Sequence, residues 1–319
     1  MKYGIGTSTF WVTSFKGLIR RVIPASMWTT LRLWRLRRSI DAYSPRVAKH
    51  RFGGVDLRVS LRDPLAAGWY DRDWETLSEI AELGRHRLRP GARVFNIGAH
   101  QGIVALMLHE AVSPGGHVVA IELSAHNARI AEENRLLNGV AGVTVVNAAV
   151  ARVDGTITVN EGLNGQVDDG TGQWGLVTVP SISIDSLSHN YGQPDVLFID
   201  IEGYEVEALR GASETLAARP DLFVEVHVNH GIENFGGTAE DVLNILRPLG
   251  YSFVVANETR KVFLSIEQSL EVLSDRFFLI AWTEQSAYRK KGKSEPGGPR
   301  REVVDRPRGV DVPAARRSE

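Results

Sequence analysis

From Arg93 onward, short apolar runs rich in β-branched residues alternate with helix-length segments, and this alternation is the strongest constraint on the fold. Apolar strands of this kind, joined by helices, are typical of a parallel sheet covered on both faces by right-handed crossovers. We therefore expect an α/β fold: a Rossmann-like, doubly wound, mostly parallel sheet with an antiparallel edge strand. The predicted strands are Arg93–Ile97, His117–Ile121, Val143–Asn147, Val196–Asp200 and Leu222–Val228. The predicted helices are Ile103–Glu110, Ala125–Asn138, Glu205–Leu216 and Thr238–Leu249. Late in the chain, we expect a strand pair at the edge of the sheet, Tyr251–Val255 with Arg276–Thr283.

Changes in composition divide the chain into three regions. Residues 1–50 form a basic amphipathic extension, residues 51–284 form the main domain, and residues 285–319 form a polar tail without periodicity that we expect to be disordered. The sequence contains no cysteine, so disulfides, thiolate metal sites and a cysteine nucleophile are excluded. No apolar run approaches the roughly 20 residues of a membrane-spanning helix, and no secretory signal is evident. We expect a cytoplasmic protein.

The basic extension could contact a membrane peripherally. Between residues 10 and 36, arginines are interleaved with tryptophan, leucine and isoleucine, a composition typical of helices that lie in a membrane interface. The alternative is that these apolar side chains pack on the main domain or in a dimer interface. We do not expect nucleic-acid binding, because the basic residues form no recognised motif.

A glycine-containing turn follows the first strand of the predicted sheet. It reads Asn96-Ile97-Gly98-Ala99-His100-Gln101-Gly102, and its G-x-x-x-G spacing differs from the G-x-G-x-x-G of dinucleotide sites. Glu122 ends the second strand, where a carboxylate can accept hydrogen bonds from the hydroxyls of a ribose. Ala149 follows the third strand among small residues that leave room for an adenine. The pattern predicts a nucleoside-containing cofactor, bound by Asn96, Gly98, His100, Gly102, Glu122 and Ala149.

Together these residues resemble the FkbM family of S-adenosylmethionine (SAM)-dependent methyltransferases over roughly residues 55–282. The resemblance is carried by Phe95–Gly102, Ala120–Glu122, Glu133–Gly139, Ile184–Leu187, Phe198–Glu205, Leu209–Ala212 and Val224–His227. It implies a class I methyltransferase fold, SAM as the cofactor, and O-methylation of a hydroxyl on a sugar, a glycolipid or a polyketide-like acceptor. One departure is Asn96, where the family usually has aspartate. We expect this loss of charge to weaken SAM binding.

Acidic residues and a histidine follow the fourth and fifth predicted strands, where the acceptor should lie. Asp200, Glu225 and His227 are the candidate catalytic residues, and Glu202 and Asn229 are the candidate substrate-binding residues. Glu225 and His227 share one face of a strand, so three interpretations stay open. In the first, His227 or Asp200 is a general base and Glu225 holds the histidine tautomer. In the second, which we do not favour, the three bind a divalent cation. In the third, Glu225 and His227 satisfy each other structurally. We therefore assign no metal ligand.

Two rival functions fit parts of the pattern. A degenerate SAM-binding partner subunit without catalysis would fit Asn96, whereas the candidate catalytic residues argue against it. An NAD-dependent dehydrogenase would share the acidic residue Glu122, but the shorter glycine pattern does not favour it.

Overall fold

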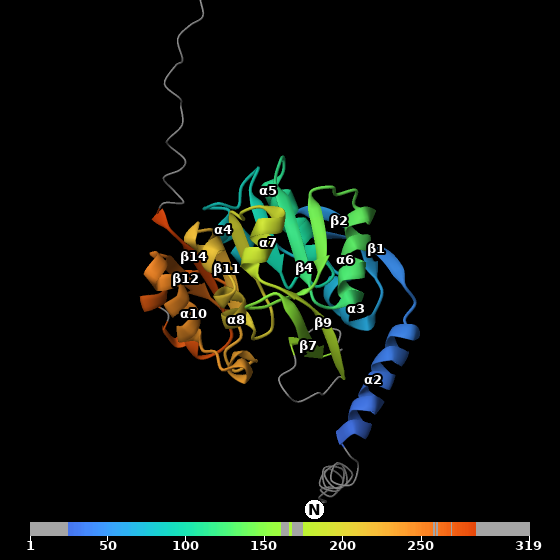
Figure 1. Ribbon diagram of the computed structural model, residues 1–319. Coiled ribbons are helices and arrows are strands. Elements are labelled where there is room, and N and C mark those ends of the chain that lie inside the picture. Colours follow the sequence, from blue (N-terminus) through green and yellow to red (C-terminus); the bar gives the residue numbers. More distant parts are fainter. Residues whose placement is uncertain are drawn as a thin grey trace, which may run out of the picture.

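The computed structural model describes residues 25–160, 166–167, 175–257, 259, 261–268 and 270–284. A single eight-stranded sheet dominates it (Figure 1), with strand order β13-β12-β14-β11-β10-β3-β4-β5. Strands β5, β4, β3, β10 and β11 are parallel to one another, so the expected doubly wound fold is confirmed. Their bounds are β3 Arg93–Ile97, β4 His117–Glu122, β5 Val143–Asn147, β10 Val196–Ile199 and β11 Asp221–Val226.

The late strands complete one end of this sheet. β14 (Phe277–Trp282) runs antiparallel to β11 and also to β12 (Ser252–Ala256). The short β13 (Leu264–Ser265) lies outside β12. The expected strand pair is therefore present. Its second strand, β14, lies between β11 and β12 and runs antiparallel to both, so it is not at the edge of the sheet.

Helices follow the strands as the apolar pattern predicts, but two of them are divided. The predicted helix Thr238–Leu249 is α10 (Ala239–Leu246) followed by the 3₁₀ helix η2 (Arg247–Leu249). The predicted helix Glu205–Leu216 is two helices, because the carboxylate of Asp185 accepts hydrogen bonds from the backbone N–H groups of Glu214 and Thr215 and so caps a second helix. The helices of the sheet region are α5 Ile103–Val112, α6 Ala125–Leu137, α7 Ile184–Tyr191, α8 Glu205–Arg210, α9 Ser213–Ala217 and α10 Ala239–Leu246. The 3₁₀ helices are η1 Ile232–Phe235, η2 Arg247–Leu249, η3 Ile266–Gln268 and η4 Leu270–Ser274.

The chain before the sheet builds one side of the molecule. A hairpin of β1 (Arg46–Phe52) and β2 (Val55–Leu61) follows helix α2 (Ala25–Asp41), and α3 (Pro64–Tyr70) and α4 (Ser78–Leu83) follow the hairpin. Phe52, Leu57, Val59 and Leu61 are buried in the same apolar cluster as α5. The predicted boundary between residues 50 and 51 therefore falls inside β1. In the part of the chain that the structure describes, no helix is both long and apolar enough to cross a bilayer.

A second, smaller sheet was not predicted. It has the order β6-β9-β7-β8 and lies between β5 and β10 in the chain. Its bounds are β6 Ala149–Val150, β7 Gly155–Asn160, β8 Gln166–Val167 and β9 Leu176–Ile182. Figure 1 shows β7 and β9 below the main sheet, toward the end of α2 that lies farthest from the hairpin. The polar tail 285–319 lies outside the described residues.

Candidate functional site

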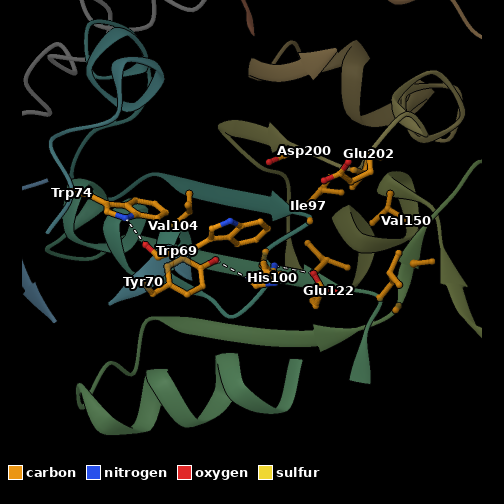
Figure 2. A pocket seen from close by; sticks show the side chains of 17 residues that line it. Trp69, Tyr70, Trp74, Ile97, His100, Val104, Glu122, Val150, Asp200 and Glu202 are labelled. Atoms are coloured by element: carbon orange, nitrogen blue, oxygen red, sulfur yellow. Dashed lines mark hydrogen bonds between the residues drawn. The ribbon is translucent and has the colours of Figure 1, made fainter. Parts of the chain in front are cut away.

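A pocket opens at the carboxyl ends of β3, β4 and β10. This is where ligands bind in doubly wound sheets. Figure 2 shows aromatic side chains on one side of it and the carboxylates Asp200 and Glu202 on the other. The lining residues are Trp69, Tyr70, Trp74, Ile97–His100, Val104, Ile121–Leu123, Ala148–Val150 and Asp200–Glu202.

The glycine turn forms the floor of the pocket. The backbone N–H groups of Gly98 and Ala99 both donate to the carbonyl of Ile121, at 2.9 Å, which ties the turn to the end of β4. Gly98 has a φ of 86°, a left-handed conformation that favours glycine. A Cβ there would lie 1.7 Å from the carbonyl oxygen of Asp200. Glycine at position 98 therefore lets the turn after β3 touch the chain after β10.

Glu122 is buried, with only 5% of its surface exposed. Its Oε2 accepts from the backbone N–H of His100 and its Oε1 from that of Ser124, each at 2.8 Å. Burial raises the pKa of Glu122 to about 7, against the opposing effect of these backbone hydrogen bonds. The side chain of Asn127 is a third hydrogen-bond partner of this carboxylate. Because two carboxylate oxygens accept about four hydrogen bonds in all, capacity for a ligand hydroxyl remains. The predicted position of an acidic group beside the glycine turn is thus occupied by a fixed carboxylate.

The aromatic wall is a feature that the sequence did not reveal. Trp69 and Tyr70 end helix α3, and Trp74 donates from Nε1 to the carbonyl of Trp69 at 3.0 Å. The hydroxyl of Tyr70 lies 2.8 Å from Nδ1 of His100, and the rings of Trp69 and His100 are 5.0 Å apart. His100 itself has a φ of 48°. The wall therefore joins the glycine turn directly, a contact without any signal in the linear sequence.

The predicted cofactor residues divide into two groups. Gly98, His100, Glu122 and Ala149 line the pocket. Gly102 is the N-cap of α5 and faces Ala131 of α6, so its place is in helix packing. Asn96 is 1% exposed, and its Oδ1 has no hydrogen-bond partner among the described residues. Neither Asn96 nor Gly102 is among the lining residues.

A group of carboxylates surrounds one imidazole beside the pocket. Nε2 of His227 lies 3.7 Å from Oδ1 of Asp200, 3.8 Å from Oε2 of Glu202 and 3.7 Å from Oε1 of Glu225. The structure therefore brings together Asp200, Glu202, Glu225 and His227 as the sequence predicts. We call these four residues, with Glu205, the acidic cluster.

The carboxylate that holds the tautomer of His227 is Glu205, not Glu225. Nδ1 of His227 and Oε1 of Glu205 are 2.8 Å apart, and both side chains are buried. The strand pattern predicts Glu225 as the hydrogen-bond partner of His227, because the two residues share a face of a strand. In the structure the partner is Glu205 of α8, which precedes β11 in the chain. Burial would lower the pKa of His227, whereas the hydrogen bond and charge of Glu205 and the charge of Asp200 outweigh it and hold that pKa above its usual value. Desolvation of Asp200 inside the pocket and the charge of Glu225 raise its pKa.

The loop after β10 has an uncommon backbone. Glu202 has a φ of 53° and Gly203 a φ of 103°, and a Cβ on Gly203 would lie 2.4 Å from the carbonyl carbon of Gly231. Left-handed non-glycine residues concentrate at functional sites. The backbone N–H of Gly203 donates to Oε1 of Glu205 at 2.8 Å, so the same carboxylate oxygen fixes both this loop and His227.

Asn229, the second predicted substrate residue, has another place. Its Nδ2 donates to the carbonyl of Ser274 at 2.8 Å, and its backbone N–H donates to Oε1 of Glu233. It is absent from the pocket lining. In this structure its side chain joins the chain after β11 to η4.

Comparison with known proteins identifies the domain that carries this geometry. Residues 96–253 match the family described as the Methyltransferase FkbM domain. The match begins at Asn96 in the glycine turn and ends in β12. These residues form an FkbM methyltransferase domain. This confirms the resemblance, and with it S-adenosylmethionine as the cofactor.

Individual relatives are more distant. A protein-L-isoaspartate O-methyltransferase of Aeropyrum pernix is 34% identical over 116 residues, which cover 34% of this chain and 43% of that protein. The chain thus matches less than half the length of this curated relative. An FkbM methyltransferase structure from Methylobacillus flagellatus has 16% identity and a TM-score of 0.42, covering 60% of this chain and 44% of that one. A SAM-dependent O-methyltransferase structure from Thermotoga maritima has 14% identity and a TM-score of 0.41, covering 77% and 80%.

The residues of the pocket fit S-adenosylmethionine. Glu122 offers acceptor oxygens for the ribose, in the position where the sheet brings a nucleoside. Ala148, Ala149 and Val150 present small side chains for the base, and the aromatic wall covers the opposite side. The Oδ1 of Asn96 is buried and has no hydrogen-bond partner among the described residues. A buried acceptor without a hydrogen bond destabilises the fold unless a donor, such as a ligand group, bonds to it.

Proposed function

We propose that this protein transfers a methyl group from S-adenosylmethionine to a hydroxyl of a sugar, a glycolipid or a polyketide-like acceptor. The observation that carries the proposal is the acidic cluster, whose members Asp200 and Glu202 line the same pocket as Glu122 and the glycine turn. A hydroxyl must lose its proton when it is methylated, so a proton acceptor beside the cofactor pocket is the group that this reaction needs.

Asp200 is the member of the cluster that we assign as the proton acceptor. Its side chain is 41% exposed and lines the pocket, whereas that of His227 is 2% exposed and lies behind it. The bound cofactor supplies an electrophilic methyl group on a sulfonium. Asp200 then takes the hydroxyl proton, and Glu202 on the same loop orients the acceptor. His227 and Glu205 keep this loop in place from below, which is a positioning role.

The acceptor side of the pocket lies toward the cluster and the small sheet. Nε2 of Gln166 in β8 donates to Oε2 of Glu202 at 3.2 Å. The small sheet therefore reaches the proposed acceptor site, and it belongs to an insertion that the alternating strand–helix pattern does not require. We propose that this sheet helps to select the acceptor.

The proposal is tested by methyl transfer to a panel of sugars and polyhydroxylated natural products, followed by NMR of the product. A methyl ether is the expected product, and a methyl group on nitrogen or on a carboxylate would contradict the proposal. Asp200→Asn should lower kcat by roughly 10²–10⁴-fold, the usual contribution of a general base. Glu207→Gln, a change outside the cluster where the carboxylate pairs with Arg210, should leave kcat unchanged.

A further inference from the structure

The acidic cluster has one feature that a general base does not need: the Nε2 of a buried histidine side chain lies within ion-pair distance of three carboxylates but is not hydrogen-bonded to any of them. The side chain of His227 is 2% exposed. Its Nδ1 is engaged by Glu205, whereas no hydrogen bond reaches Nε2 in the part of the chain that the structure describes. The oxygens of Asp200, Glu202 and Glu225 stand at 3.7, 3.8 and 3.7 Å from Nε2, beyond hydrogen-bond length.

The distances from Nε2 of His227 to the carboxylate oxygens match those between two atoms that coordinate the same metal ion. Metal–ligand distances for nitrogen and oxygen are about 2.0–2.2 Å, so two ligand atoms on opposite sides of one ion lie roughly 4.2 Å apart. One ligand atom each from Asp200, Glu202 and His227 lies within 4.8 Å of the others. A small closing movement of the exposed carboxylates brings all three to an ion.

The surroundings of His227 are also those of a metal ligand. Ligating histidines almost always donate their second ring N–H to a carboxylate, a backbone carbonyl or a water, which fixes the tautomer and turns the other nitrogen toward the metal. Glu205 does this for His227 at 2.8 Å, with both side chains buried. Glu205 also accepts from the backbone N–H of Gly203, so the carboxylate behind the histidine holds the loop that carries Glu202.

We propose that Asp200, Glu202 and His227 bind a divalent cation that holds the acceptor hydroxyl, a role that rests on the function proposed above. One imidazole with carboxylates suits Mn²⁺ or a related first-row ion. Asp200 and Glu202 are 41% and 27% exposed toward the pocket, so the ion keeps open positions on that side, as catalytic metals do. The sequence pattern alone does not favour this cation; the observation that does is the Nε2 of the buried His227 side chain, which faces three carboxylates at 3.7 to 3.8 Å.

The reaction step balances with the groups present. The cation lowers the pKa of the acceptor hydroxyl, and the hydroxyl proton passes to Oδ2 of Asp200, whose Oδ1 faces Nε2 of His227. An oxygen lone pair forms the bond to the methyl carbon. The carbon–sulfur bond breaks, and its electron pair stays on sulfur, so no oxidant or reductant is needed.

Binding of Mn²⁺ to the full chain, without cofactor or acceptor, tests the site directly. The electron paramagnetic resonance signal of free Mn²⁺ should fall as the chain is added, with one ion bound per chain. Asp200→Asn and Glu202→Gln, at partly exposed positions that should not disturb folding, should each weaken binding by about tenfold or more. Glu205→Gln should weaken it by roughly 10- to 100-fold, the usual effect of losing a carboxylate behind a ligating histidine.

Two control variants distinguish Mn²⁺ binding at the acidic cluster from nonspecific Mn²⁺ binding to other charged residues. Glu207→Gln and His189→Asn change residues outside the cluster, the latter with a side chain that is 68% exposed, and both should bind Mn²⁺ as the native chain does. Equal binding by the native chain and Asp200→Asn, or no binding by the native chain, would overturn the proposal. Methyl transfer undiminished after dialysis against EDTA would overturn the cation and leave the proposed function standing. Mn²⁺ bound at the cluster without any hydroxyl methylation would support the cation and contradict the function.

Discussion

At the scale of single residues, Glu122 is the group whose ionisation should control cofactor binding. Its pKa is raised to about 7 by burial, and its ionised form is the better acceptor for ribose hydroxyls. Below that pKa the free protein carries a proton there that binding must release, so affinity falls as pH falls through about 7 and levels off above it. We expect this dependence for methylthioadenosine, which has the ribose but no amine that titrates in this range.

Calorimetry of methylthioadenosine between pH 6 and pH 8, a range of about one unit on either side of that pKa, gives the measurement. Glu122→Gln is the control: it cannot ionise, so its weaker affinity should be independent of pH. A pH-independent affinity of the native chain would contradict the assignment of Glu122.

Asn96 makes a second prediction at this scale. Its Oδ1 is buried without a hydrogen-bond partner among the described residues, so Asn96→Asp places a carboxylate where no donor is described. We expect a lower melting temperature for the free variant, because a buried charge without a donor is costly. We also expect tighter SAM binding, because the carboxylate restores a negative charge near the cofactor. Thermal melts with and without SAM measure both effects, and equal SAM affinities in the two proteins would reject the second.

At the scale of elements, Asp63 connects the aromatic wall to the glycine turn. It caps α3 by accepting from the backbone N–H of Ala66 at 2.8 Å, and its Oδ2 accepts from Nε2 of Gln101 at 2.8 Å and lies 3.1 Å from Nε2 of His126. Burial would raise the pKa of Asp63, but these hydrogen bonds outweigh it and lower that pKa. Its contribution to stability is therefore present above the usual value of 3.8 and lost as pH falls through the lowered pKa.

Asp63→Asn should reduce the free energy of unfolding by about 1–3 kcal/mol, the cost of leaving buried donors unsatisfied. SAM affinity should fall with it, because α3 carries Trp69 and Tyr70. Urea unfolding at pH 7 and at acid pH measures the difference, which should shrink at the lower pH. Asp56→Asn alters an exposed pair with Lys49 and should change stability by less than about 0.5 kcal/mol. Equal losses in the two variants would contradict the role of Asp63.

Periodicity predicted the main sheet well and the walls of the site poorly. Apolar runs such as Val196–Ile199 are buried on both faces, so pattern alone identifies them. The strand β9 is mostly exposed and contains Pro180, which weakens its strand signal. The contact of Tyr70 with His100 spans 30 residues, and the bond from His227 to Glu205 joins the residue after β11 to α8. Such pairs exist only after the chain has folded.

At the scale of the whole molecule, helix α2 carries the exposed apolar side chains that a peripheral membrane contact requires. Met27 and Trp34 are 59% and 53% exposed, whereas Leu33 packs close to Gly175 before β9. The first part of the proposed contact segment, residues 10–24, lies outside the described residues. We propose that the exposed face of α2 binds anionic lipid surfaces.

Co-sedimentation with phosphatidylserine-containing vesicles tests this surface. The double variant Met27→Ser, Trp34→Ser should partition less than the native chain because it removes exposed apolar area from the helix. Val262→Ser, an equally exposed apolar position far along the chain, is the control and should partition as the native chain does. Identical partitioning of all three proteins would end the membrane proposal.

The central claim is that the pocket at the ends of β3, β4 and β10 binds S-adenosylmethionine through Glu122. Calorimetry of SAM, and then of NAD, on the full chain tests it most directly. Glu122→Ala removes the pocket carboxylate, and Glu132→Ala is the control because Glu132 pairs with Arg135 on α6, outside the pocket. The account predicts SAM binding that Glu122→Ala weakens by roughly 10- to 100-fold, about 1.5–3 kcal/mol for hydrogen bonds to a charged group, with Glu132→Ala unchanged and NAD silent. The absence of SAM binding, or equal SAM binding by the native chain and Glu122→Ala, would contradict it.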